Sequence, residues 1–280
     1  MIIECVVNVS EGRDQRVLTQ LAAPLGPVLL DVHSDPDHHR SVFTLAGPAD
    51  DTAEAAEALA TAAVEHVTLS GHQGAHPRLG VLDVVPFVPY APGGPAPTDL
   101  SGVVPRRDAF ARWLADTLGV PSFLYGPLPG GRTRTLPEVR RQAFGPLRPD
   151  AGPSAPHPSA GASAIGARGV LVAYNVWVSS VEVAETVAPL VRSAQVRALG
   201  LAVGDRAQVS CNLVAPGDFG PAQLYDAVAT EVGAAGGDVL GAELVGLLPA
   251  SVLAAIPTAR WRELGLSEEV TVEARLEQRA

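Results

Sequence analysis

The sequence contains no lysine, because all 20 of its basic residues are arginine. Enzymes that form a Schiff base through a lysine amine are therefore excluded. Acidic residues outnumber basic ones by 30 to 20, which gives a formal net charge of −10. A chain of this charge repels nucleic-acid phosphates and anionic membrane surfaces. We expect neither as a partner.

Cysteines and long apolar segments are also scarce. The two cysteines, Cys5 and Cys211, lie in apolar runs typical of strands, so we expect buried free thiols and no disulfide. The apolar N-terminal segment 1–9 is short and lacks the basic leader of a signal peptide. Because no run of 18 apolar residues occurs either, we expect a cytoplasmic protein.

Hydrophobic periodicity predicts the order strand, helix, strand, strand, helix, strand twice along the chain. In the first half we expect strands at 2–9, 28–34, 41–46 and 81–88, and helices at 49–67 and from a cap at Asp14 to about residue 23. In the second half we expect strands at 170–177, 199–203, 207–213 and 239–245, and helices at 181–197 and 223–235. This order is that of the split βαβ unit.

These patterns predict an α/β (α+β) fold of two ferredoxin-like βαββαβ subdomains, at 1–165 and 166–280. Helices cover one face of each sheet, so the opposite faces are free to meet across a ligand cleft. Residues 86–169 between the two patterns are rich in Pro, Gly and Ser, with one helix expected at 107–118. Within this segment, 152–166 is expected to line the cleft, where small ligands usually bind.

Histidines gather in two polar loops, DVHSDPDHHRSV and SGHQGAHPRLG. These loops contain His33, His38, His39, His72 and His76. The second loop follows a long helix and precedes a buried strand, a position that holds its side chains over the edge of a sheet. His76 is accordingly the strongest candidate for a functional histidine.

A zinc site is the alternative use of these histidines. His72 and His76 are four residues apart, as in a helical metal pair, but the glycines and Pro77 around them oppose a helix. The other three histidines and the nearby aspartates could add ligands. A metal-dependent hydrolase that uses the five histidines therefore stays open, although no structural-zinc pattern occurs.

Charged residues accompany His76 in the sequence. Asp83 could hold the imidazole in one tautomer, or it could form an ordinary ion pair with Arg78; both interpretations stay open. Arg78 and Arg40 are the natural carboxylate-binding residues, because a guanidinium binds a carboxylate through two parallel hydrogen bonds.

Several segments resemble, in order, the formiminotransferase domain of the glutamate formimidoyltransferase and formiminotransferase-cyclodeaminase family. They are ECVVNVSEGRD, GHQGAHPRLGVLDVVPFVP, GPSAPHPSAG followed by GAR, AQVSCNL and GAELVGLLP. The resemblance runs from Glu4 to about Leu276, and motifs of this length and order are specific. It implies two α/β subdomains with folate between their sheets, and a homodimer.

The resemblance also implies the reaction: transfer of a formimino group from N-formimino-L-glutamate to N5 of tetrahydrofolate, the co-substrate, in histidine degradation. It implies that His76 is the catalytic general acid/base. An imidazole with a pKa near 6.5 can move both protons of this reaction, so no metal ion is needed. The residues implied to bind folate are Gly152, Pro153, Ser154, Ala155, Pro156, His157, Pro158, Ser159, Ala160 and Gly161.

Other substrate contacts follow from the same comparison. We expect Arg78 to hold the glutamate carboxylates, with Arg40 and Arg192 as further candidates. We expect Asn8 or His39 to hydrogen-bond the ligand. A folate-binding homologue that acts on another one-carbon or amidine substrate is a second alternative.

Two departures from the family pattern affect these expectations. Ala160 replaces a tryptophan, which predicts weaker pterin binding unless Tyr174 or Trp177 supplies a ring, and predicts that Ala160→Trp tightens it. Because the chain ends at Ala280 without the cyclodeaminase domain of animal relatives, we expect a separate cyclodeaminase to complete the pathway.

Overall fold

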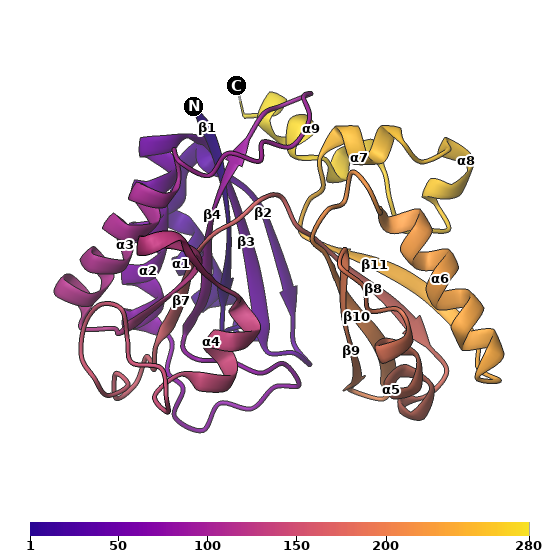
Figure 1. Cartoon of the computed structure of the whole chain (residues 1–280), viewed down its shortest axis with the longest axis horizontal. Helices are drawn as coiled ribbons and strands as arrows, with labels where there is room; N and C mark the ends of the chain where they lie inside the picture. The colour runs from indigo at the N-terminus through magenta and orange to yellow at the C-terminus, as the bar shows by residue number, and fades with distance from the viewer. Residues whose placement is uncertain (280) are drawn as a thin grey trace. The chain divides into compact units, whose positions relative to one another are not determined.

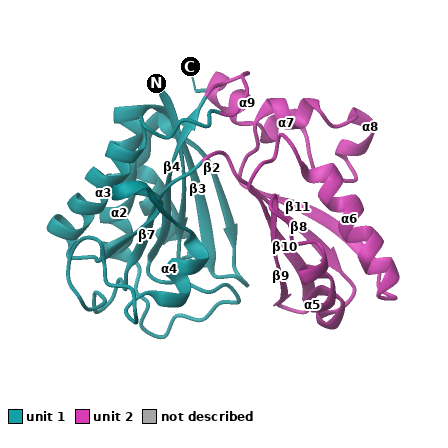
Figure 2. Cartoon of the chain, viewed as in Figure 1, with its two compact units in different colours: residues 1–90, 97–168, 279 teal, residues 91–96, 169–278, 280 magenta. Residues whose placement is uncertain are grey.

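The computed structural model describes residues 1–279, which form two compact units (Figure 2). Unit 1 contains residues 1–90, 97–168 and 279, and unit 2 contains residues 91–96 and 169–278. Each unit has its own sheet and its own hydrophobic core. The predicted α/β fold with two sheets is confirmed, and the cleft expected between the sheets stays a prediction.

Unit 1 begins with the predicted βαββαβ order (Figure 1). Its elements are β1 (Ile2–Val9), α1 (Gln15–Ala22), the 3₁₀ turn η1 (Ala23–Val28), β2 (Leu29–Asp35), β3 (Arg40–Pro48), α2 (Ala49–His66) and β4 (Leu82–Tyr90). Asp14 caps α1 by accepting hydrogen bonds from the backbone N–H groups of Arg16 and Val17. The strands pair antiparallel in the order β2-β3-β1-β4, which is the ferredoxin-like arrangement.

Three further strands extend this sheet to the order β2-β3-β1-β4-β7-β5-β6. The added elements are α3 (Val104–Leu118), β5 (Ser122–Leu128), η2 (Pro129–Gly131), β6 (Arg132–Arg134), α4 (Leu136–Gln142) and β7 (Ser163–Ala167). β7 pairs parallel to both β4 and β5. The sequence predicted only α3 in this region, because β5, β6 and β7 are short, and β5 and β7 contain glycine.

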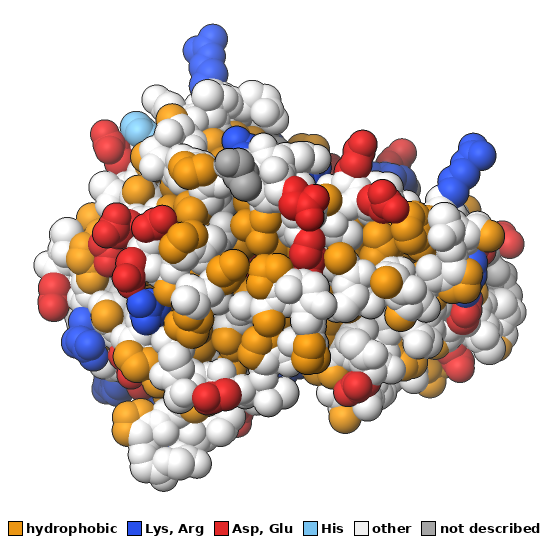
Figure 3. All heavy atoms as spheres, turned by 90° about the horizontal axis from the view of Figure 1, so that it is seen from above, with side chains coloured by type: hydrophobic (Ala, Val, Ile, Leu, Met, Phe, Trp, Pro, Cys, Tyr) orange, Lys and Arg blue, Asp and Glu red, His pale blue; other side chains and the backbone are white. Residues whose placement is uncertain are grey.

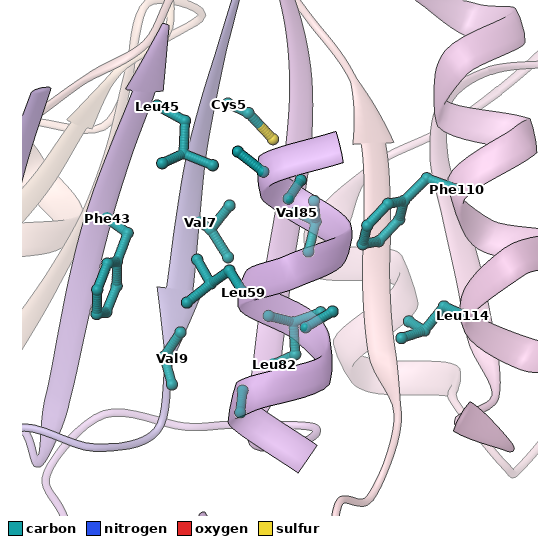
Figure 4. Packing of buried hydrophobic residues seen from close by; sticks show 14 of the residues in the cluster. Cys5, Val7, Val9, Phe43, Leu45, Leu59, Leu82, Val85, Phe110 and Leu114 are labelled. Atoms are coloured by element: carbon teal, nitrogen blue, oxygen red, sulfur yellow. The ribbon is translucent and has the colours of Figure 1, made fainter. Parts of the chain in front are cut away.

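Helices α2 and α3 cover one face of the unit 1 sheet (Figure 1). Figure 4 shows Leu59 of α2 beside Val7 and Val9 of β1, and all three are fully buried. Full burial of such a side chain contributes about 1.5 to 3 kcal/mol. The alternate residues of β1, among them Asn8, point to the opposite face, and α4 packs there through the buried Val139. The candidate site lies on this second face.

Unit 2 repeats the βαββαβ plan and adds short helices at its end. Its elements are β8 (Val172–Val178), α5 (Val181–Leu190), β9 (Val196–Val203), β10 (Arg206–Leu213), α6 (Pro221–Ala234), β11 (Val239–Val245), α7 (Ala250–Ala254), α8 (Thr258–Trp261), η3 (Glu268–Val270) and α9 (Val272–Glu277). The sheet order is β11-β8-β10-β9, with every pair antiparallel. Helix α5 ends before the predicted residue 197, because the Ser193 hydroxyl accepts the N–H groups of Gln195 and Val196 in a turn.

The cysteines, the apolar segments and the acidic residues can be compared with the expectations drawn from composition. Cys5 and Cys211 are free and buried, as predicted. Within residues 1–279, no helix is both long enough and apolar enough to cross a bilayer. Acidic side chains are scattered over the face shown in Figure 3, in keeping with the net charge of −10.

Candidate functional site

His76 lies in the loop between α2 and β4, and Arg78 organises this loop from within. The Arg78 Nη2 donates to the carbonyl oxygens of His76 (2.7 Å) and Gly74 (3.0 Å). Its Nη1 contacts Nδ1 of His72. The guanidinium expected to hold substrate carboxylates is thus engaged with its own loop.

His72 and His39 form a stacked pair beside this loop, with ring centroids 4.0 Å apart. The Nε2 of His72 donates to the Ser10 carbonyl oxygen (2.9 Å), so both ring nitrogens of His72 have protein partners. The Nδ1 of His39 accepts the N–H of Gly12 at 3.2 Å. Burial lowers the pKa of both histidines. These rings connect the two predicted histidine loops and hold them together.

Arg40, the first residue of β3, brings a charge directly to His76. Its Nε donates to Oδ1 of Asn8 (3.0 Å), and its Nη1 donates to Oδ2 of Asp83 (2.6 Å). The same Nη1 lies 3.2 Å from Nδ1 of His76. Asn8, expected to bind the ligand, therefore positions Arg40.

Asp83 owes its direction to a β-bulge between β1 and β4. Asn8 pairs with Val84 but Val9 pairs with Leu82, which leaves Asp83 as the extra residue. Strand alternation alone did not fix its direction. The carboxylate is fully buried, and it binds Arg40, Arg140 and the Leu79 N–H instead of the His76 ring.

Arg140 is the site residue that sequence reasoning missed. It lies on α4, and its Nη2 donates to Oδ2 of Asp83 at 2.7 Å. A signal was present: Thr135 and Glu138 form a capping box, which predicts a helix start at this point. That pattern could have located α4, but not the sheet face on which the helix packs.

The tautomer of His76 follows from its contacts. Nδ1 lies 2.8 Å from the carbonyl oxygen of Pro77, which can only accept a hydrogen bond. Nδ1 therefore carries the proton, and Nε2 keeps its lone pair. The longer contact from Nδ1 to Arg40 is then a proximity of two donors, not a hydrogen bond.

The charges around His76 change the protonation expected from the sequence. Burial, with the charge of Arg40 as the next cause, lowers the pKa of His76 to about 3. The pKa departs from the expected value near 6.5 first because the ring is withdrawn from solvent, and second because guanidinium groups from β3 and α4 converge on it. Burial raises the pKa of Asp83, but Arg40 and Arg140 outweigh it and lower the pKa below its ordinary value. At neutral pH the site holds a neutral imidazole and an ionised carboxylate.

The segment 152–161 lies directly beside the histidine loop. Backbone hydrogen bonds join Leu69 N–H to the Ser159 oxygen and Val81 N–H to the Ala160 oxygen, both at 2.9 Å. Gly161 has φ = +72°, and a Cβ there would overlap the Leu79 carbonyl oxygen, so the close approach requires glycine. The two segments selected from the sequence thus meet in unit 1.

The side chains of this segment differ in their exposure to solvent. Residues 152–156 are exposed, whereas the Nδ1 of His157 accepts the N–H of Ala160 (3.0 Å) and forms a turn. The Ala160 side chain is 1% exposed and packs in the core. The space for a larger side chain at this position is therefore limited, and tighter pterin binding by Ala160→Trp stays a prediction.

Other predicted residues lie elsewhere. Arg192 is in unit 2, where its Nε donates to the Ala198 oxygen (2.9 Å). Tyr174 is fully buried in the unit 2 core, and the Arg206 guanidinium covers the ring of Trp177 at 3.9 Å. Across residues 1–279, no three His, Cys, Asp or Glu side chains are grouped to hold a metal ion, so the hydrolase alternative lacks a ligand set.

Comparison with known proteins shows the family of the chain. Residues 2–168 match the family described as formiminotransferase domain, N-terminal subdomain. The chain belongs to this family. It is 35% identical to a glutamate formimidoyltransferase of Streptococcus pyogenes over 278 residues, or 90% of each chain. It is 31% identical to the glutamate formimidoyltransferase of Thermoplasma acidophilum over 304 residues, which cover 100% of this chain and 98% of the relative.

A third relative is longer. The chain is 35% identical over 282 residues to the formimidoyltransferase-cyclodeaminase of Sus scrofa. The aligned region covers 90% of this chain and 51% of the relative. It thus spans about half the length of that protein. These matches confirm the resemblance read from the sequence motifs, and this formiminotransferase family member is a transferase.

Proposed function

We propose that this transferase moves the formimino group of N-formimino-L-glutamate to N5 of tetrahydrofolate, with His76 as the proton carrier. The observation that carries the proposal is the His76 ring itself. It is neutral, its Nδ1–H is bonded to the Pro77 oxygen, and its Nε2 lone pair is left for substrate. A fixed imidazole with one free lone pair is suited to general base catalysis.

The reaction requires two proton transfers, one from N5 and one to the departing glutamate nitrogen. The N5 amine attacks the formimino carbon and gives a tetrahedral intermediate with a positively charged N5. Nε2 of His76 accepts the N5 proton and then donates it to the glutamate nitrogen. The bond between that nitrogen and the formimino carbon breaks, glutamate leaves, and the formimino group stays on N5.

The low pKa of free His76 is compatible with this role. The attacked N5 is cationic and therefore a strong acid, so a weak base can remove its proton. Binding of an anionic substrate beside Arg40 offsets the charge that depresses the imidazole pKa. The ring then becomes a better base when the donor is in place.

The charges of the site support a dicarboxylate donor. Arg40 and Arg140 place two positive charges near the His76 ring, and Asp83 places one negative charge there. The net positive charge favours a donor that carries carboxylates. Within residues 1–279, Nη2 of Arg40 has no hydrogen-bond partner, and we propose that it binds one of these carboxylates.

The segment Gly152–Gly161 is proposed to bind the reduced folate. The support is its place beside the histidine loop and the exposure of residues 152–156. Ligand contacts by His39 and Arg192, a homodimer, a cytoplasmic location, a separate cyclodeaminase and the subdomain boundary at 165/166 stay predictions.

A donor-competition assay tests the proposal. The purified protein is given tetrahydrofolate with formiminoglutamate, with formylglutamate, or with formiminoglycine, which lacks the second carboxylate. We expect formation of 5-formimino-tetrahydrofolate to be fastest with formiminoglutamate. Equal rates with formiminoglycine would contradict the dicarboxylate assignment, and no product from any donor would contradict the proposed reaction.

A further inference from the structure

Arg140 hydrogen-bonds to two groups that lie next to His76. Its Nη1 donates to the Pro77 carbonyl oxygen (3.2 Å), which is the acceptor of the His76 Nδ1–H bond. Its Nη2 donates to Oδ2 of Asp83 (2.7 Å), which is also the acceptor of Arg40. The two groups that fix the Nδ1 side of the ring are therefore both bound by one guanidinium.

The geometry of this contact requires the arginine fork. Nη1 and Nη2 together reach three acceptors, namely the Pro77 oxygen and both carboxylate oxygens of Asp83. A lysine ammonium is a single point donor and cannot span this set. The chain supports the arrangement from outside the loop, because the capping box of Thr135 fixes the start of α4 and the buried Val139 fixes the adjacent turn.

We propose that Arg140 is a positioning residue that fixes the tautomer and the orientation of the His76 ring. The inference rests on the proposed function of His76 as the proton carrier. Arg140 holds the Pro77 oxygen in place to accept Nδ1–H, and it holds Asp83 so that Arg40 stays beside the ring. Nε2 is thereby kept unprotonated and directed away from the Pro77 oxygen.

Removal of the fork should release the ring without removing it. In Arg140→Gln, the Pro77 oxygen loses one donor and the Asp83 carboxylate keeps only Arg40 and the Leu79 N–H. The ring can then take the other tautomer by accepting the Arg40 Nη1–H at Nδ1. Misplacement of a catalytic group by about 1 Å reduces turnover by about 10²-fold.

The test combines a spectrum of the free protein with kinetics. Long-range ¹H–¹⁵N spectra, assigned with His76→Ala, report which nitrogen of His76 carries the proton. We expect one tautomer in the wild type, a mixture in Arg140→Gln, and an intermediate result in Arg140→Lys. We expect kcat to fall by about 10²-fold in Arg140→Gln. Arg141→Gln, at the exposed neighbour on α4, is the matched control and should change neither.

The outcomes separate this inference from the proposed function. A mixed tautomer in Arg140→Gln supports the positioning role even if formiminoglutamate proves not to be the donor. An unchanged His76 spectrum in Arg140→Gln would overturn the positioning role. This holds even if kcat and Tm both fall in that variant, because such a fall would then report a loss of stability. If Arg140→Gln does not fold, Arg140→Lys decides by the same spectrum, since wild-type signals in that variant contradict the role.

Discussion

The two units share one plan, including a β-bulge at the same topological place, but only one of them uses the bulge for a charged site. In unit 1 the extra residue between β1 and β4 is Asp83, and in unit 2 the extra residue between β8 and β11 is Leu240. Asp83 is fully buried between two arginines, whereas Leu240 is 62% exposed. The fold therefore supplies the bulge, and the residue placed in it, with the arginines around it, creates the chemistry.

Replacement of each bulge residue by alanine should give the largest difference between the two units, measured as the free energy of unfolding. Asp83→Ala leaves two guanidinium groups partly buried without their carboxylate, and breaking such a pair reduces the free energy of unfolding by about 3 to 5 kcal/mol. Leu240→Ala at the exposed bulge should change it by less than about 0.5 kcal/mol. Urea unfolding followed by circular dichroism measures both, and equal losses would show that the bulges are equivalent.

A tryptophan at Ala160 should reveal the core position of this residue. The methyl group is 1% exposed, so an indole forces side chains and backbone apart and reduces the free energy of unfolding by about 1 to 3 kcal/mol. Ala155→Trp, in the exposed part of the same segment, is the control and should be tolerated. Tighter folate binding by Ala160→Trp at unchanged stability would restore the aromatic-platform interpretation.

A fall in pH should reduce the stability of unit 1 more than that of unit 2. All seven histidines lie in unit 1. The pKa of His76 is lowered to about 3 in the folded chain, so between about pH 6.5 and pH 3 the unfolded chain binds a proton that the folded chain does not. The unfolding free energy therefore decreases as the pH falls through this window, and the lowered pKa values of His39 and His72 act in the same direction.

Hydrogen exchange followed by peptide mapping measures this difference. We expect protection factors of unit 1 amides to fall from pH 7 to pH 4.5 while those of unit 2 stay nearly constant. His76→Gln should reduce the fall in unit 1. Equal losses in both units would contradict the assignment of the pH dependence to the histidine loops.

The smallest expected effect is a change in the His76 pKa on binding of a dicarboxylate. Glutamate beside Arg40 should raise this pKa above its value of about 3, because an anion favours the imidazolium form. Histidine NMR titration with and without saturating glutamate measures the shift. Glutamine, with one carboxylate fewer, should raise it less, and a pKa independent of either ligand would place the carboxylates elsewhere.

Alternation of apolar residues was enough to predict both βαββαβ units, since it records which face of each strand is buried. It did not predict β5, β6 and β7, which are short; glycine also breaks the alternation in β5 and β7. Arg140 was missed for the same reason, because its helix lies in that segment. The direction of Asp83 depends on a bulge, and a bulge is a property of two paired strands that one strand's sequence does not reveal.

The sequence predicted several residues of the candidate site, but it did not predict which contacts each of them makes. His76 and Arg40 were named from the sequence and do lie together. Arg78 was expected to hold substrate, but it binds the carbonyls of its own loop. The pKa of His76 also could not be predicted, because it depends on the burial of the ring and on charges that converge from β3 and α4 only in the folded chain.

The most direct test of the account is the turnover of His76→Ala beside His66→Ala, which removes an exposed histidine at the end of α2. Formimino transfer from formiminoglutamate to tetrahydrofolate is measured for both variants, with calorimetric folate binding as a check on folding. We expect His76→Ala to lose about 10²- to 10⁴-fold in kcat while it still binds folate, and His66→Ala to match the wild type. A His76→Ala variant that folds, binds folate and turns over at the wild-type rate would contradict the role of His76.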